Sequence, residues 1–163
     1  MNKYAGIKYN DIVDGEGVCV SFWTQGCPHK CQGCHNPQTW SFDGGEEIPN
    51  DLEKQIIEAI GANGIQRNFS ILGGEPLCNE NLSLIQGIVK SVKNVYPSIK
   101  IFVWSGYTIE ELSGRRRSNE VLNDILSNID VLIEGRYIQE KRDLTLKWRG
   151  SSNQKILYRG KDF

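Results

Sequence analysis

The stretch FSILGGEPLCNENLSLIQGIVKSVKNVYPSIKIFVWSGYT, residues 69–108, holds two apolar runs separated by a segment of helical periodicity. The runs 69–72 and 100–108 predict strands because they are short and apolar. The segment 79–97 predicts a helix that Pro97 closes. A strand, a helix and a second strand in this order indicate parallel pairing through a crossover, which is typical of the α/β class.

The same alternation extends to both sides of this stretch. Further strands are expected at 18–24, 130–135 and 155–158, and further helices at 109–114 and 118–129. Another helix is expected within 49–64, with Asn50 or Asp51 as its N-cap and Gly61 as its stop. A complete eight-unit barrel takes about 250 residues. The 163 residues therefore predict one domain, 1–163, with either a partial barrel or a small open sheet of parallel β/α units.

Composition excludes some classes of partner. The chain has 19 Lys and Arg against 20 Asp and Glu, a net charge of -1, so neither a nucleic acid nor a membrane is an expected partner. No apolar run approaches the length of about 18 residues that a membrane span needs, and the N-terminal residues lack a signal peptide's apolar core. We expect a cytoplasmic protein. Its five cysteines, an odd count, favour metal binding or redox exchange over a disulfide framework.

Three cysteines are concentrated in CPHKCQGCHNPQTW, residues 27–40. Cys27, Cys31 and Cys34 have the spacing Cys-x3-Cys-x2-Cys, and clustered thiolates select zinc, copper(I) or iron–sulfur centres. Structural zinc generally takes four ligands, the second pair some 12 to 20 residues away. The candidates for a fourth ligand are His35, which directly follows Cys34 and is poorly placed to share its metal, and the distant Cys19 and Cys78. A [4Fe–4S] cluster on three thiolates would instead leave one iron open to a substrate.

The other unusual residues also follow predicted strands. Gly73, Gly74, Glu75 and Pro76 come directly after one strand, and Ser105 and Glu134 end two others. The carboxyl edge of a parallel sheet is where ligands bind. The two glycines permit close backbone approach, the glutamate offers an anionic acceptor, and the proline fixes the turn.

Taken together, Cys27-x3-Cys31-x2-Cys34 and the GGEP motif resemble the radical S-adenosylmethionine family. The segments DGEGVCVSFWTQGC and CHNPQTW, on either side of the cysteines, resemble the activases of glycyl-radical enzymes. WSGYT, DVLIEGRY and RGSSNQKI, later in the chain, resemble the branch that acts on anaerobic ribonucleoside-triphosphate reductases. The resemblance covers nearly the whole chain.

This resemblance implies a fold, cofactors and a partner. The fold would be a partial, incomplete TIM-like barrel, and Cys27, Cys31 and Cys34 would hold a [4Fe–4S] cluster with S-adenosylmethionine on the open iron. Reductive cleavage of S-adenosylmethionine would give a 5′-deoxyadenosyl radical, which would generate a glycyl radical on the large subunit of the reductase. A flavodoxin or ferredoxin would supply the electron.

The resemblance also implies site residues. The GGEP motif would hold the methionine end of S-adenosylmethionine, while Ser105 and Glu134 would reach its carboxylate, ribose hydroxyls or ammonium. The residue before the third cysteine, often aromatic in this superfamily, is Gly33 here. Adenine contact would then come from the backbone of Gly33, Cys34 and His35, from the His35 ring, or from an apolar neighbour.

Several interpretations stay open at this level. The target could be another glycyl-radical enzyme, such as a formate-lyase type, or the chain could be a small radical enzyme of the queuosine-pathway kind. A zinc-binding interaction module is the non-enzymatic alternative. Cys19 and Cys78 are interpreted as buried thiols, Trp23 and Trp104 as core residues. Arg149, Asn153 and Gln154 would either cap the sheet or face a partner.

Overall fold

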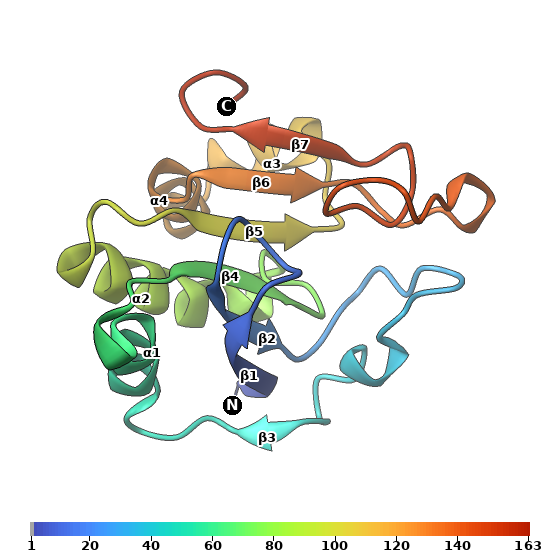
Figure 1. The fold of residues 1–163 in the computed structure, drawn as a ribbon. Helices are drawn as coiled ribbons and strands as arrows, with labels where there is room; N and C mark the ends of the chain where they lie inside the picture. The colour runs from blue at the N-terminus through green and yellow to red at the C-terminus, as the bar shows by residue number, and fades with distance from the viewer. Residues whose placement is uncertain (1) are drawn as a thin grey trace.

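The computed structural model describes residues 2–163 and contains one seven-stranded sheet with helices packed on one face (Figure 1). The strands are β1 Lys3–Asp11, β2 Cys19–Thr24, β3 Glu46–Glu47, β4 Asn68–Gly73, β5 Ile101–Ser105, β6 Val131–Glu134 and β7 Lys155–Tyr158. The α-helices are α1 Leu52–Ile60, α2 Asn79–Val95, α3 Ile109–Arg116 and α4 Glu120–Asn128, and short 3-10 helices are η1 Pro37–Thr39, η2 Ala62–Gly64 and η3 Gln139–Lys141.

The centre of the sheet is parallel. The sheet order is β3-β1-β2-β4-β5-β6-β7, and the pairs β2–β4, β4–β5 and β5–β6 are parallel. Helices α1 and α2 make two of the connections, and α3 with α4 makes the third. The predicted α/β class with a mostly parallel sheet is therefore confirmed.

The edges of the sheet differ from the sequence prediction. Strands β1, β3 and β7 pair antiparallel with their neighbours, and β1 and β3 were not predicted. β1 is mostly half-buried or exposed and holds glycine and charged residues, so its sequence lacks the apolar run of the central strands. The helix expected within 49–64 is confirmed as α1, which begins after Asp51 and ends before Gly61 as predicted, and η2 follows it.

The helices begin where side chains satisfy their free backbone N–H groups. Thr108 and Glu111 form a capping box at the start of α3, and the Asn119 side chain accepts from the Leu122 N–H at the start of α4. None of the helices within residues 2–163 has both the length and the apolar character needed to cross a bilayer.

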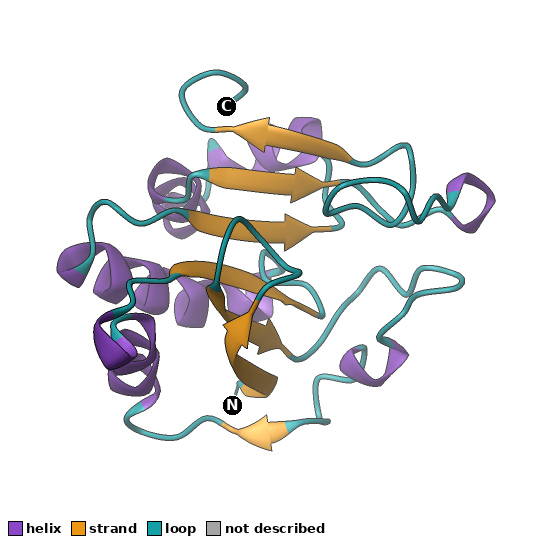
Figure 2. Ribbon diagram, viewed as in Figure 1, coloured by secondary structure: helices purple, strands orange, loops and turns teal. Residues whose placement is uncertain are grey.

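The two faces of the sheet are covered differently, as Figure 2 shows for the helices. In β5, Ile101 and Val103 pack into the large core beneath the helices, whereas Phe102 packs with Val131 and Ile133 in a small cluster on the opposite face. Period-two alternation along the strand explains this division. The face without helices is thus left to loops, and it adjoins the functional site.

Candidate functional site

A cavity of about 290 Å³ lies at the carboxyl edge of the parallel strands. Figure 1 shows the loop after β2 and the loop after β6 at this same edge. The residues predicted from sequence that line the cavity are Cys27, Cys31, Cys34, His35, Gly73, Gly74, Glu75 and Ser105. The structure therefore brings most of the expected site together from segments far apart in the chain.

The cysteine loop, residues 26–40, is closed by its own backbone. The Gly26 N–H donates to the Thr39 carbonyl at 2.7 Å, and the Cys27 N–H donates to the Trp40 carbonyl at 3.0 Å. All three cysteines of the loop are half-buried. Burial raises the pKa of the Cys27 and Cys31 thiols, so these groups favour the protonated form until a metal replaces the proton.

The donor set fits an iron–sulfur cluster better than a single ion. Among residues 2–163 no three His, Cys, Asp or Glu side chains converge on a site for one metal ion. Cluster thiolates need not converge, because each binds a different iron. In addition, the buried Nε1–H of Trp40, a residue of the cavity wall, has no hydrogen-bond partner within the described chain. The sulfur atoms of a cluster would offer acceptors beside this wall.

The two glycines of the GGEP motif allow β4 to approach the start of the cysteine loop. Gly73 has a φ of +106°, and a Cβ on it would overlap the backbone of Thr24. A Cβ on Gly74 would overlap the carbonyl of Gly26. The Glu75 N–H then donates to the same Gly26 carbonyl at 2.8 Å. Any larger residue would separate the motif from the loop.

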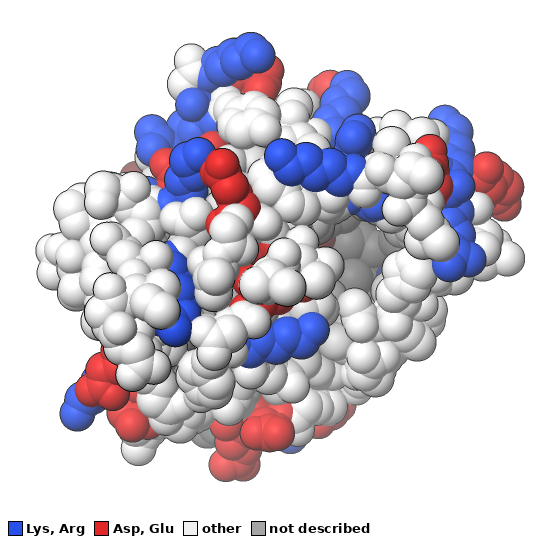
Figure 3. Space-filling view, in the orientation of Figure 1, with Lys and Arg blue, Asp and Glu red and all other residues white. Residues whose placement is uncertain are grey.

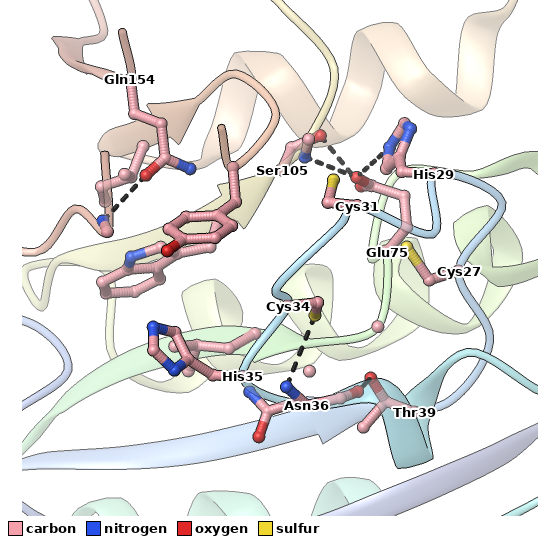
Figure 4. A pocket seen from close by; sticks show the side chains of 18 of the residues that line it. Cys27, His29, Cys31, Cys34, His35, Asn36, Thr39, Glu75, Ser105 and Gln154 are labelled. Carbon is pink, nitrogen blue, oxygen red and sulfur yellow. Dashed lines mark hydrogen bonds and ion pairs between the residues drawn. The ribbon is translucent and has the colours of Figure 1, made fainter. Parts of the chain in front are cut away.

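The carboxylate of Glu75 is buried at the centre of a hydrogen-bond network (Figure 4). Oε1 lies 2.8 Å from Nε2 of His29 and accepts from the Gly106 N–H at 2.7 Å. Oε2 accepts from the Ser105 hydroxyl at 2.9 Å and from the Leu77 N–H at 2.8 Å. In the tautomer that carries a proton on Nε2, His29 donates in the first contact.

Aromatic side chains form another part of the cavity wall, apart from the cysteine loop and the GGEP motif. Trp23, Trp104, Tyr137 and Trp148 all line it. The expectation that Trp23 fills the core is therefore wrong, whereas Trp104 lines the cavity and also packs against the small core cluster around Phe102. Both are only half-buried. Strand alternation places Trp104 on the same face as Phe102, away from the helices. His35 extends this wall, because its ring centroid lies 5.6 Å from that of Tyr137.

The polar tail residues cap the end of β6. The Gln154 side chain accepts from the N–H groups of Gly150 and Ser151 and donates to the Gly135 carbonyl at 2.9 Å. The Asn153 side chain donates to the Arg136 carbonyl at 2.8 Å. Gln154 also lines the cavity, so it shapes the wall while satisfying the loop backbone.

Three predicted site residues lie outside the cavity lining. Gly33, with a φ of +79°, packs against the Gln139 side chain, which a Cβ would overlap. Pro76 is buried in the turn before α2. Glu134 is buried and accepts from the Ile109 N–H at 2.6 Å, at the start of α3, and burial raises its pKa.

The other two cysteines are buried, as predicted. Cys19 is 0% exposed in β2 and Cys78 is 1% exposed at the start of α2. Burial raises the pKa of Cys78 to about 12, which keeps it a thiol. Neither residue lines the cavity.

Sequence reasoning did not predict that His29, Tyr137 and Trp148 line the cavity. His29 is one of several polar residues between the cysteines, and no sequence signal distinguishes it. Tyr137 and Trp148 lie in irregular backbone, where periodicity predicts nothing. Their place in the wall follows from the path of the tail across the end of β6.

The charge of the molecule is unevenly distributed around this edge. Residues 136–163 contain eight of the 19 Lys and Arg but only three of the 20 Asp and Glu. In Figure 3 basic side chains predominate over the region of β7 and the loops after β6, and the surface is hollowed beside them. The positive charge of the tail is therefore offset by a net negative charge on residues 1–135.

The mostly parallel sheet carries a loop with three cysteines at its carboxyl edge, and comparison with known proteins identifies the chain as an iron–sulfur protein. The family model described as "4Fe-4S single cluster domain" matches residues 13–157. The chain is 41% identical over 150 residues to the anaerobic ribonucleoside-triphosphate reductase-activating protein of Pasteurella multocida, covering 91% of this chain and 92% of that protein.

Two further relatives carry the same name. The Vibrio cholerae protein is 38% identical over 147 residues, covering 90% of this chain and 91% of its own, and the Escherichia coli K12 protein is 35% identical, covering 90% and 92%. The chain belongs to the 4Fe–4S single-cluster family and, within it, to the group of anaerobic ribonucleoside-triphosphate reductase-activating proteins.

Proposed function

We propose that this chain activates an anaerobic ribonucleoside-triphosphate reductase as a radical S-adenosylmethionine enzyme. Cys27, Cys31 and Cys34 would hold a [4Fe–4S] cluster with one open iron, within a single domain that forms a partial TIM-like barrel. When bound and reduced by a flavodoxin or ferredoxin, the cluster would supply the electron that splits S-adenosylmethionine into methionine and a 5′-deoxyadenosyl radical. That radical would take a hydrogen atom from a glycine of the reductase and become 5′-deoxyadenosine.

One observation carries the proposal. The three thiols line one cavity at the carboxyl edge of the sheet together with Gly73, Gly74 and Glu75 of the GGEP motif, about forty residues further along the chain. The names of the relatives supply the target.

The chain's own residues would position the ligand and exclude water. Backbone groups at Gly73 and Gly74 would receive the methionine end, and the aromatic wall around Trp104 and Tyr137 would bury the apolar surface. The cavity is small for a drug-sized ligand, for which about 300–1,000 Å³ is usual. We therefore expect the reductase, docked in the cytoplasm over this edge, to complete the wall during radical transfer.

The experiment is anaerobic. The cluster is reconstituted and verified by iron and sulfide content, and the chain is mixed with reductant, S-adenosylmethionine and the reductase. The proposal expects 5′-deoxyadenosine and a glycyl-type EPR doublet on the reductase. Absence of both products with an intact cluster would contradict it. Zinc in place of iron and sulfide in anaerobically purified protein would favour the interaction module instead.

A further inference from the structure

Glu75 connects three segments of the chain through its carboxylate. His29 belongs to the cysteine loop, Ser105 and Gly106 to the end of β5, and Leu77 to the turn before α2. These four groups donate at 2.7 to 2.9 Å, two to each oxygen. Glu75 is 0% exposed, so the donors to its carboxylate come from the protein and not from solvent.

This network uses the full acceptor capacity of Glu75. An ionised carboxylate has about four lone-pair sites, and all four have donors from the chain. An ammonium group of a ligand would have to displace one of them. The acceptor that the sequence analysis expects Glu75 to offer to the ligand is therefore already occupied by donors of the protein.

His29 is the contribution of the cysteine loop to this network. Its side chain is 6% exposed, and its ring meets the Tyr107 ring edge-on with 4.5 Å between centroids. Gly106 leaves the space for this ring, since a Cβ there would lie 2.5 Å from Cδ2 of His29. The imidazole is therefore fixed by a hydrogen bond, by aromatic contact and by the shape of the strand end.

His29 lies between Cys27 and Cys31, so its contact with Glu75 affects where both thiols lie. The backbone bonds of Gly26 and Cys27 to the other end of the loop hold the side of the loop that carries Cys27. Cys31 follows His29 after Lys30, whose φ of 49° turns the chain sharply. The His29–Glu75 hydrogen bond thus fixes the segment between Cys27 and Cys31 against the turn that follows β4.

We propose that His29 is a positioning residue: through its hydrogen bond to Glu75 it holds the cysteine loop at a fixed position relative to the GGEP turn. This inference rests on the proposed function, because its consequence is the placement of S-adenosylmethionine between the two segments. Without the hydrogen bond the thiols would still bind iron. The distance between the cysteine loop and the GGEP turn, which together hold the ligand, would no longer be fixed.

The test compares His29→Phe with His29→Gln. Phenylalanine keeps the contact with Tyr107 but cannot donate, whereas the glutamine amide supplies an N–H. Iron and sulfide content, the Tm, and the dissociation constant for S-adenosylmethionine on the oxidised cluster are measured for each. We expect His29→Phe to retain the cluster and to weaken S-adenosylmethionine binding roughly tenfold or more, and His29→Gln to recover most of the affinity.

A spectroscopic readout separates positioning from general destabilisation. The change that S-adenosylmethionine causes in the EPR spectrum of the reduced cluster should be diminished in His29→Phe and restored in His29→Gln. Lys93→Met is the matched control, because it removes one donor, at 2.7 Å, from Asp130 at the opposite end of the same strands. This control should lower the Tm without altering ligand affinity or the EPR change.

The outcomes distinguish the two proposals. If the wild-type chain with a verified cluster fails to bind S-adenosylmethionine, the proposed function is wrong. If the wild type binds it and His29→Phe binds equally well, the role of His29 is wrong and the function stands. Equal weakening in His29→Phe and His29→Gln, or the same loss in Lys93→Met, would also overturn the positioning role.

Discussion

The indole Nε1–H of Trp104 donates to the backbone carbonyl of Trp148 at 2.8 Å, which ties the loop after β6 to the end of β5. The Trp148 ring in turn meets Phe102 edge-on with 5.1 Å between centroids. One wall of the cavity is therefore fixed by a hydrogen bond from a strand side chain to an irregular loop.

Trp104→Phe should loosen this wall. The substitution keeps an aromatic ring but removes the donor, so the loop around Trp148 loses its attachment to β5. We expect faster amide hydrogen exchange in residues 142–151 and little change in the helices. Trp23→Phe is the control, because the indole of Trp23 donates within β2, to Ser21 at 3.0 Å. Unchanged exchange in the loop would show that other contacts hold it.

Gly106→Ala should destabilise the strand end against the cysteine loop. The new Cβ would lie 2.5 Å from the His29 ring, so the ring or the strand must move. Overpacking of this kind costs about 1–3 kcal/mol of unfolding free energy, measurable by urea titration of the iron-free chain. Gly114→Ala is the control, since its Cβ meets nothing within 4 Å in α3 and should stabilise the helix. Equal stability in both variants would contradict the close packing of His29 on Gly106.

Removing single cysteines should separate ligands from buried thiols. Cys31→Ala should abolish the cluster, seen as lost iron, lost sulfide and lost absorbance near 400 nm, together with cleavage of S-adenosylmethionine. Cys78→Ser should keep all of these, because Cys78 is buried outside the cavity. Retention of a full cluster by Cys31→Ala, or its loss in a folded Cys78→Ser, would reverse the assignment.

Asp14 should make the iron-free chain less stable as the pH rises. Burial and a hydrogen bond with Asp11 raise the pKa of Asp14 from 3.8 to about 7. The ionised partner is Asp11, whose Oδ1 accepts from the Val13 and Asp14 N–H groups. Because the folded state holds the Asp14 proton more tightly, its contribution is complete below the unfolded value of 3.8 and is gone once the pH passes about 7.

The measurement is the free energy of unfolding between pH 5 and 8. The wild type should lose stability relative to Asp14→Asn as the pH rises to about 7, and the difference should be constant above that. A difference that is independent of pH across this range would show that the carboxyl of Asp14 is not protonated in the folded chain.

The central strands were predictable because burial on both sides gives them continuous apolar sequences. The runs at 69–72 and 130–135 correspond to β4 and β6 to within one residue at each end. β1 was not predictable in this way, because it lies near the sheet edge and alternates with glycine and charged residues. The β3 pairing of Glu46 and Glu47 has no sequence signal at all.

The site was predictable where chemistry restricts the residue type. Thiols at short spacing and glycines at a strand end are unusual enough to be recognised, and the structure places them together. The hydrogen bond of His29 joins it to Glu75, 46 positions further along the chain, and no local sequence pattern predicts that contact. Trp104 was assigned to the core because hydrophobicity alone does not say which face of a sheet a side chain occupies.

The long sequence separation of the site also has a consequence for how the protein matures on the ribosome. The cysteine loop is synthesised early, but the groups it rests on follow much later, with Glu75 after 46 residues and Tyr137 near the end of the chain. N-terminal segments emerge first, so the thiols are exposed before their supports exist. The loop can take its final position only after Glu75 and Tyr137 have been synthesised. We therefore expect the iron–sulfur cluster to be inserted after translation of residues 136–163.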